Sequence, residues 1–273
     1  MGELKNRLIY GSLSIALLAL FIWLGPYLWF RPIFGIALAL IALTALWECY
    51  QLGKLKGISV PAPFAIGCGL FYLIVHYLQT QGFMEGVPHP SAIAIGFSLF
   101  ALFVYQCAAP KEAIASLSLS LFGLLYTIVP LAWTLDLLYL TENGRWWLTF
   151  VIAVTVLTDI GAYLVGRTVG RIHPWPKLSP RKTLEGSLGG IAFGVGGALA
   201  MVPLYGPISY TTAAILGLVL AIVGQIGDLS ESLLKRDAEV KDSNRLPGLG
   251  GMLDVVDSLL FNVPTTLFAL TLL

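Results

Sequence analysis

The chain has 273 residues, of which 57% are apolar and only 11% are charged, against roughly 25% charged residues in an average soluble domain. The mean hydropathy is +0.84 and the formal net charge is +1. So few charges cannot cover the surface of a soluble protein. This excludes a soluble fold, a disordered chain and a nucleic-acid-binding protein with a basic face. The composition therefore predicts an integral membrane protein.

Hydropathy in chain order gives nine apolar segments, each about as long as a helix that crosses a bilayer. Because open strands and loops cannot face lipid, we expect helices, and the predicted fold class is an all-α, polytopic membrane protein. Pro130 is expected to kink the fifth span. The expected spans are residues 8–25, 32–52, 60–80, 91–109, 116–138, 146–166, 186–205, 211–234 and 255–273.

The first segment resembles a signal peptide in position, but we expect it to be a retained span. Trp23, Gly25 and Pro26 take the place of the small residues that a cleavage site needs. Cysteines are also uninformative as a motif, because they lie singly in apolar segments without the spacing of a metal site. We expect all three, Cys49, Cys68 and Cys107, to be small buried apolar residues.

The distribution of basic residues predicts the topology. If the N-terminus is cytoplasmic, the cytoplasmic segments hold 14 of the 16 Lys and Arg residues, and only Arg31 and Arg145 lie outside. This is the asymmetry that the positive-inside rule describes. We therefore expect a cytoplasmic N-terminus and an outer C-terminus. The longest polar stretches, residues 167–185 and 235–254, then both lie in the cytoplasm.

Carboxylates inside membrane spans are costly, so each is a candidate functional group. Asp228, Glu231 and Lys235 lie in the eighth span with spacings of three and seven residues, which places them on one helical face. Asp254 and Asp257 are three residues apart and are expected to share one face at the start of the ninth span. A pair between Glu231 and Lys235 is the role that we expect for Glu231.

Together with Asp159 in the sixth span, these acids lie toward the cytoplasmic ends of three helices, beside two basic loops. Carboxylates suit a hard cation such as Mg²⁺, and Lys and Arg suit phosphate oxygens. The arrangement predicts a site for a phosphorylated substrate and a metal. The alternative is a set of structural ion pairs within the membrane. Glu48 and Asp136 lie near span ends, and we expect them to be interfacial.

The loop that follows the sixth span contains the segment SPRKTLEGSLGG at residues 179–190. It offers hydroxyl groups, positive charges and flexible glycines, and the backbone N–H groups at the start of the seventh span favour phosphate binding. It lacks the spacing of a Walker A loop. Gly186, Gly190 and Gly194 recur every four residues, as in closely packed membrane helices, and for the later two we expect a packing role.

Residues 228–258, DLSESLLKRDAEVKDSNRLPGLGGMLDVVDS, resemble the signature of the phosphatidate cytidylyltransferases, also called CDP-diacylglycerol synthases. DIGAYLVGRTVGR, SPRKTLEGSLGG and GQIGDLSES resemble further stretches of the same family, so the resemblance is dense from about residue 155 to 258. The residues on matching positions are Ser232, Lys235, Arg236, Lys241, Asp242, Pro247, Gly248, Gly250, Gly251, Asp254 and Asp257.

Three positions depart from the pattern of the family. Leu249 replaces a His, Val255 replaces an Arg, and Asn244 stands where a small residue is usual, in a loop that is one residue shorter. Arg245 is the nearest candidate to substitute for the missing groups. Every carboxylate of the pattern is retained, so we expect the chemistry of the family to tolerate these changes.

The resemblance implies transfer of a cytidylyl group from CTP to phosphatidate, which gives CDP-diacylglycerol and pyrophosphate. It implies catalytic roles for Asp228, Asp254, Asp257, Lys235 and Arg236, and Mg²⁺ ligation, with room for a second cation, by Asp228, Asp254, Asp257 and Asp159. It implies substrate-binding roles for Ser179, Arg181, Lys182, Thr183, Lys241, Asp242, Arg245, Gly250 and Gly251.

The resemblance also predicts how the chain is divided and where it works. Residues 1–145, spans one to five, are expected to supply packing and a lipid groove, and residues 146–273, spans six to nine, the catalytic part. Expected partners are CTP, phosphatidate and membrane lipid, without nucleic acid, and the glycine-lined faces permit a homodimer. A retained first span, short loops and few cysteines favour a bacterial inner membrane, with a cytoplasmic active site, and a eukaryotic endoplasmic reticulum is the alternative.

Three alternatives remain open from the sequence. The first is a CTP-dependent transferase that acts on another lipid phosphate or a lipid alcohol, since the residues of the signature recognise phosphate groups and not the hydrocarbon part of the lipid. The second is an ion-coupled transporter, which also needs carboxylates within the membrane. The third is an inactive relative, suggested only by Leu249 and Val255.

Overall fold

The computed structural model describes residues 17–108, 112–204, 206–240 and 251–272. The regular elements in these ranges are all helical: α2 (Arg31–Leu55), α3 (Ala62–Thr80), α4 (Pro90–Ala108), α5 (Ala113–Gly123), the π-helical turn η1 (Leu124–Ile128), α6 (Val129–Tyr139), α7 (Gly144–Val169), α8 (Leu184–Met201), α9 (Tyr210–Asp237), α10 (Met252–Val256) and α11 (Leu259–Leu270). Residues 17–24 are also helical.

Eight stretches of the described chain are long and apolar enough to cross a membrane. They correspond to the second to ninth predicted spans, with α5, η1 and α6 forming one stretch and α10 and α11 another. The predicted all-α, polytopic membrane fold is confirmed. Most of the first predicted span, residues 8–25, lies outside the described residues, so the total of nine stays a prediction.

Local sequence signals explain where several helices begin. Proline occupies the first or second position of α2 and α3, where its missing N–H has no intrahelical partner to lose. Thr183 and Ser209 begin α8 and α9, each accepting a hydrogen bond from a backbone N–H three residues ahead. These caps fix the points at which two loops return to the bundle.

The fifth span changes its hydrogen-bond pattern close to the predicted kink. The chain makes a π-helical turn at η1, and Pro130 follows as the second residue of α6. Proline cannot donate a backbone hydrogen bond, so the helix is weakest in the turn before it. In the same turn the Thr127 hydroxyl donates to the carbonyl of Gly123 at 2.8 Å.

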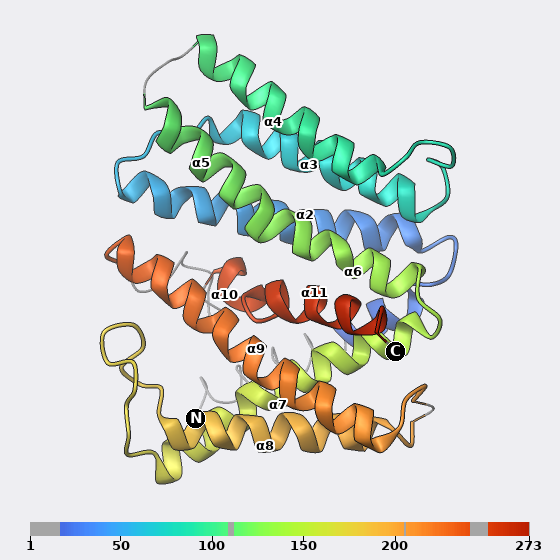
Figure 1. Ribbon diagram of the computed structural model, residues 1–273, viewed down its shortest axis with the longest axis vertical. Helices are drawn as coiled ribbons and strands as arrows, with labels where there is room; N and C mark the ends of the chain where they lie inside the picture. The colour runs from blue at the N-terminus through green and yellow to red at the C-terminus, as the bar shows by residue number, and fades with distance from the viewer. Residues whose placement is uncertain (1–16, 109–111, 205, 241–250, 273) are drawn as a thin grey trace.

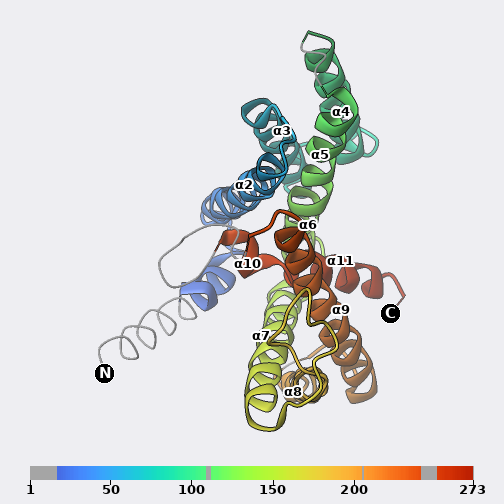
Figure 2. The ribbon, with the colours of Figure 1, turned by 90° about the vertical axis from the view of Figure 1, so that its left-hand side faces the viewer.

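The helices form two groups with α10 and α11 between them (Figures 1 and 2). Helices α2 to α6 make one group and α7 to α9 the other, and α11 packs against α6, α7 and α9. Within the second group, a Cβ atom added to Gly194 would lie 2.4 Å from the Thr158 hydroxyl, and one added to Gly190 would lie 2.8 Å from the Thr158 carbonyl. The predicted packing role of these two glycines is confirmed.

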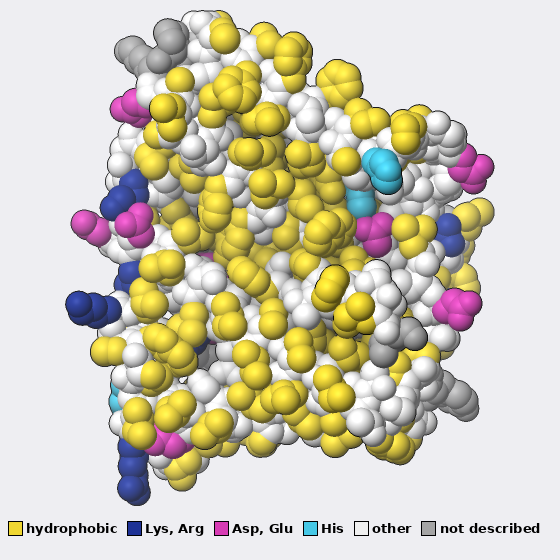
Figure 3. Space-filling model, viewed as in Figure 1, with side chains coloured by type: hydrophobic (Ala, Val, Ile, Leu, Met, Phe, Trp, Pro, Cys, Tyr) yellow, Lys and Arg dark blue, Asp and Glu magenta, His cyan; other side chains and the backbone are white. Residues whose placement is uncertain are grey.

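The surface agrees with a membrane location. In Figure 3 a broad apolar face separates charged side chains at two opposite edges, and most of the visible Lys and Arg side chains lie at the left edge. An ion pair of 3.3 Å between Lys56 and Asp237 joins the end of α2 to the end of α9. These two segments therefore lie at the same end of the bundle, as the predicted topology requires.

The cysteines match the prediction only in part. Cys49 and Cys68 are buried, as expected, but Cys107 is exposed on α4. The prediction for Cys107 was wrong because an apolar residue near the end of a membrane helix is free to face outward.

Candidate active site

A pocket of about 470 Å³ is lined by the end of α7, the start of α8 and residues Gln225 and Asp228 of α9. Its walls bring together five of the predicted site residues from three separate parts of the chain. These residues are Asp159, Arg181, Lys182, Thr183 and Asp228. Three stretches that carry the family resemblance therefore meet in one polar cavity, whereas Lys235, Arg236, Asp254 and Asp257 do not line it.

The centre of this pocket is an ion pair between Lys182 and Asp228, with the Lys182 Nζ 2.7 Å from a carboxylate oxygen. The Asp159 carboxylate is close enough to both to repel Asp228 and attract Lys182. Asp257 also interacts repulsively with Asp228 and Asp159. Asp159 and Asp228 line the pocket together with Arg167, Arg181 and Lys182, so it offers carboxylate oxygens that suit a cation and positive groups that suit phosphate oxygens.

Asp257 reaches this position through close contacts between α9 and the turn that joins α10 to α11. Its carboxylate accepts a hydrogen bond from the backbone N–H of Ser258, and the Ser258 hydroxyl donates to the Gly224 carbonyl at 3.0 Å. A Cβ atom added to Gly227 would lie 2.7 Å from the Asp257 carbonyl. Glycine at 227 therefore sets the distance between Asp257 and the helix that carries Asp228.

Gly227→Ala is expected to destabilise the protein by about 1–3 kcal/mol, because the new methyl group must push the turn at Asp257 away from α9. Thermal unfolding of the purified protein in detergent measures this effect. The matched control is Gly196→Ala, since no atom lies within 4 Å of an added Cβ atom there. Equal melting temperatures for the two variants would contradict the proposed role of Gly227.

A second polar cluster lies further along α9. Lys235 forms ion pairs with both Glu231 and Asp254, and Asp254 also accepts a hydrogen bond from the backbone N–H of Gly251 at 2.7 Å. The predicted Glu231–Lys235 pair is confirmed. Because Lys235 lies between two carboxylates, its described contacts anchor the start of α10 to α9.

Asp254 and Asp257 both lie toward α9, in agreement with the predicted shared face. The short helix α10 ends at Val256, and Asp257 lies at its C-cap, before α11 begins at Leu259. Asp254 faces Lys235, and Asp257 lies toward Asp228. The backbone keeps right-handed helical dihedral angles at Asp257 and Ser258, so the two acids keep the three-residue spacing of a helix.

Glu48 has a role that sequence reasoning missed. It is fully buried, and its two carboxylate oxygens accept hydrogen bonds from the backbone N–H groups of Met252 at 3.0 Å and Leu253 at 2.8 Å. These are N–H groups at the start of α10 that no turn of the same helix can satisfy. The expectation of an interfacial Glu48 was wrong, because α2 packs directly against α10.

Asp136 likewise has a specific partner. A carboxylate oxygen lies 3.0 Å from Nε2 of the buried His76, and Nδ1 of the same ring lies 2.8 Å from the Ser91 hydroxyl. Asp136 was expected to be interfacial, but it forms part of a polar link between α3 and α6. This link lies outside the acidic pocket, so we assign it no role in the chemistry there.

Thr183 and Arg236 organise the loop between α7 and α8. The Thr183 hydroxyl accepts a hydrogen bond from Gly186 N at 3.1 Å and is buried, so it caps α8 while lining the pocket. The Arg236 Nε donates to the Leu178 carbonyl at 3.0 Å, which ties the loop to α9. Ser179 is partly buried in the same loop, and Arg181 is exposed at the pocket.

The pocket also contains polar residues that were not predicted as site residues. Tyr163 and Arg167 lie one and two turns beyond Asp159 on α7, and an Arg167 Nη1 donates to the Tyr163 hydroxyl at 2.6 Å. Gln225 on α9 donates to the carbonyl of Ser187 at 3.2 Å. The four-residue spacing of Asp159, Tyr163 and Arg167 was a signal in the sequence that would have placed them on one face.

Several predicted substrate-binding residues lie outside the described ranges, so the structure does not place them. They are Lys241, Asp242, Arg245 and Gly250, together with Leu249. Gly251 is described, and it begins α10 as the N-cap. Val255, which replaces an Arg of the family pattern, is 50% exposed on α10.

Within the described residues, no three His, Cys, Asp or Glu side chains converge closely enough to hold one metal ion. The oxygen donors of Asp159 and Asp228 nevertheless suit Mg²⁺, which proteins often bind through one or two carboxylates together with phosphates of the substrate. The donor chemistry of the pocket therefore fits a divalent cation that arrives with a phosphorylated ligand.

Comparison with known proteins bears directly on this site. A family model described as the cytidylyltransferase family matches residues 5–273. The phosphatidate cytidylyltransferase of Bacillus subtilis (strain 168) is 31% identical over 280 residues, which cover 100% of this chain and 99% of that protein. The phosphatidate cytidylyltransferase of Synechocystis sp. is 35% identical over 305 residues, which cover 98% and 97% of the two chains.

A shorter but closer match is to the phosphatidate cytidylyltransferase of Staphylococcus aureus (strain COL). It is 41% identical over 126 residues, which cover 45% of this chain and 48% of that protein. The family model and the full-length relatives agree with the signature on which the resemblance was based, and the chain belongs to the cytidylyltransferase family.

Proposed function

We propose that this protein transfers the cytidylyl group of CTP to phosphatidate, giving CDP-diacylglycerol and pyrophosphate, in a reaction that depends on a divalent cation. The observation that carries the proposal is the convergence of Asp159 and Asp228 around Lys182, at the capped start of α8. Membership of the cytidylyltransferase family and full-length relatives named phosphatidate cytidylyltransferase support it.

Asp159 and Asp228, with Asp257 beside them, would hold the cation. A bound divalent ion supplies charge neutralisation of the triphosphate and polarises the phosphorus that is attacked. The described carboxylates supply the oxygen donors that such an ion prefers, and Lys182 is already held at 2.7 Å from Asp228. When a triphosphate enters, Lys182 exchanges part of its contact with Asp228 for phosphate oxygens.

The chemistry is a displacement at phosphorus. An oxygen of the phosphatidate phosphate attacks the α-phosphorus of CTP, a new P–O–P linkage forms, and the bond to the β-phosphate breaks so that pyrophosphate leaves. The attacking phosphate is already an anion, so no strong base is required. The residues therefore act by positioning and by electrostatic stabilisation, with Lys182 and Arg181 beside the transferred groups and the start of α8 facing negative charge.

The lipid reaches this pocket from the side of the bundle. Tyr163 lines the pocket and is 61% exposed, and Ile160 beside it on α7 is also exposed on a helix that spans the membrane. An acyl chain therefore stays in the bilayer while the phosphate enters the polar cavity. We place the pocket at the cytoplasmic face of a bacterial inner membrane, on the basis of the positive-inside asymmetry and the bacterial relatives.

In this proposal, α7 to α11 carry the chemistry and the preceding helices support it. Residues 146–273 contribute the acidic pocket, while Glu48 of the first part holds the start of α10 in place. A homodimer stays a prediction of the sequence.

The reaction predicts incorporation of label from α-³²P-CTP into lipid by the purified full-length protein with phosphatidate and Mg²⁺. Removal of the cation with EDTA is expected to stop incorporation, and re-addition of Mg²⁺ is expected to restore it. Parallel reactions with a lipid alcohol and with other lipid phosphates identify the acceptor. A labelled product only with one of those acceptors, or no product with folded protein, would overturn the proposal.

A further inference from the structure

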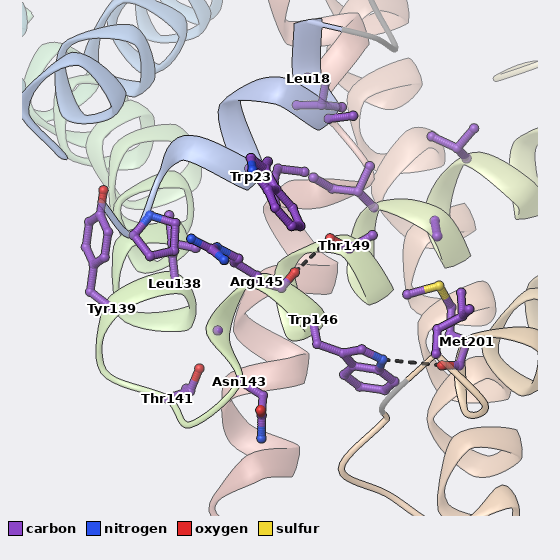
Figure 4. Close-up of a pocket in the computed structure, with 18 of the residues that line it drawn as sticks. Leu18, Trp23, Leu138, Tyr139, Thr141, Asn143, Arg145, Trp146, Thr149 and Met201 are labelled. Carbon is purple, nitrogen blue, oxygen red and sulfur yellow. Dashed lines mark hydrogen bonds between the residues drawn. The ribbon is translucent and has the colours of Figure 1, made fainter. Parts of the chain in front are cut away.

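A second cavity, of about 920 Å³, lies at the opposite end of α7 from the acidic pocket. Its walls come from residues 17–26, the end of α6, the first half of α7 and the end of α8 (Figure 4). On α7 the lining residues Arg145, Thr149, Ile152 and Val156 follow one helical stripe. The volume lies within the usual range for a site that holds a small organic molecule, about 300–1,000 Å³.

This cavity opens toward lipid. Trp23 is 61% exposed and Leu204 is 60% exposed, while Leu18 and Val156 are also largely uncovered. These side chains belong to a bundle whose helices cross the membrane, so the exposed apolar wall faces acyl chains rather than water. The cavity is thus a groove along α7 for which an acyl chain is the natural apolar occupant.

The mouth of the groove carries an uncompensated positive charge. The Arg145 guanidinium lies between the rings of Trp23 and Tyr27, at 5.1 and 5.0 Å from their centroids. Its Nε atom is buried without a hydrogen-bond partner, and none of the ion pairs in the described part of the chain includes it. The exposed Glu142 nearby forms no ion pair with it.

A second cation and the start of a helix add to this charge. Arg31 also lines the groove, lies 5.0 Å from the centroid of the Tyr139 ring and donates to the Gln81 amide oxygen at 3.0 Å. Asn143 begins α7 without a side-chain hydrogen bond, so the positive end of a 26-residue helix faces the same opening. Two Arg side chains and a helix N-terminus together favour an anion with several oxygens.

Aromatic side chains place this opening at the level of the lipid headgroups. Trp23, Trp29 and Trp146 cluster at this end of the molecule, and Trp residues are enriched where membrane meets water. The Trp146 indole is held by a hydrogen bond to the Met201 carbonyl at 3.3 Å, which joins α7 to the end of α8 (Figure 4). The groove wall is therefore fixed before any lipid binds.

We propose that this groove binds an anionic phospholipid, with its phosphate on Arg145 and one acyl chain along Ile152 and Val156 of α7. Arg145 lies 14 residues before Asp159, which is about 21 Å along the helix. That separation exceeds half of the ~30 Å hydrocarbon core. The bound lipid therefore belongs to the leaflet opposite the acidic pocket and is distinct from a substrate in that pocket.

The test measures lipid retention and does not depend on enzymatic activity. Full-length protein is purified from nanodiscs that contain equal amounts of phosphatidylglycerol and phosphatidylcholine, and native mass spectrometry counts the lipids that remain bound. We expect wild type to retain phosphatidylglycerol preferentially. Arg145→Gln is expected to weaken that retention about tenfold, which corresponds to about 1.4 kcal/mol. Lys54→Gln, which removes an exposed charge at the other end of the bundle, is the matched control.

Val156→Trp provides a second, uncharged variant that fills the apolar part of the groove and leaves Arg145 in place. It is expected to lower retention of phosphatidylglycerol to a similar extent, with an unchanged melting temperature as the check on folding. Equal retention of the two lipids by wild type, or wild-type retention by both variants, would overturn the proposal. A change in oligomeric mass in place of lipid loss would assign the groove to a second copy of the chain and would also overturn it.

Discussion

Asp228→Asn is expected to lower the rate of label transfer from CTP to lipid by at least about a hundredfold, the scale on which loss of one electrostatic group lowers catalysis. The substitution keeps the size of the side chain but removes its charge. Lys182 then loses the carboxylate at 2.7 Å that positions its ammonium group, and the pocket loses one of the oxygen donors for a cation. The measurement is the initial rate of label transfer at saturating phosphatidate.

The control for this variant lies on the same helix. Asp237→Asn neutralises an exposed carboxylate at the end of α9 whose ion pair among the described residues is with Lys56, so it is expected to leave the rate within about twofold. Thermal unfolding of both variants shows whether the fold is retained. A wild-type rate for Asp228→Asn would remove this residue from the proposed chemistry, whatever the result for the control.

Glu48→Ala is expected to destabilise the protein by about 2–5 kcal/mol, because it leaves the buried N–H groups of Met252 and Leu253 without acceptors. The start of α10 then loses its cap, and Asp254 within α10 and Asp257 at its C-cap lose their fixed positions. Activity is expected to fall together with stability. Thermal unfolding and label transfer measure the two effects on the same preparation.

Glu48→Gln separates the loss of both acceptors from the loss of charge. The amide retains one oxygen, so we expect a melting temperature and a rate between those of wild type and Glu48→Ala. Glu142→Ala removes an exposed carboxylate and is expected to change neither quantity. If Glu48→Ala melts and reacts like wild type, the cap on α10 does not hold the catalytic turn.

Much of the fold could be predicted because its signals are local. Each described span is a run of apolar residues bounded by proline, glycine or a capping hydroxyl, as at Thr183 and Ser209. The Glu231–Lys235 pair follows from helical spacing alone. Likewise, the four-residue repeat that includes Gly190 and Gly194 predicted close packing, and α7 and α8 do meet there.

Part of the site also followed from the sequence. The acids and bases of the signature were identified, and Asp159, Lys182 and Asp228 do line one pocket. Their partners were harder to predict. Asp254 pairs with Lys235, and Asp257 lies toward Asp228, two turns away on the same helix α9. Helical spacing places the two acids on one face, but the residues that they meet depend on how α9 packs against the start of the last span.

The sequence by itself determined the membrane class of this protein and the order of its described spans, because hydropathy and helical spacing act between neighbours in the chain. Only the tertiary structure decided that Glu48 caps a helix 204 residues away and that Arg145 faces an apolar groove without a carboxylate among the described residues. Such contacts depend on the crossing of helices that are distant in sequence. Their physical cause is the need to pair buried polar groups where water is absent.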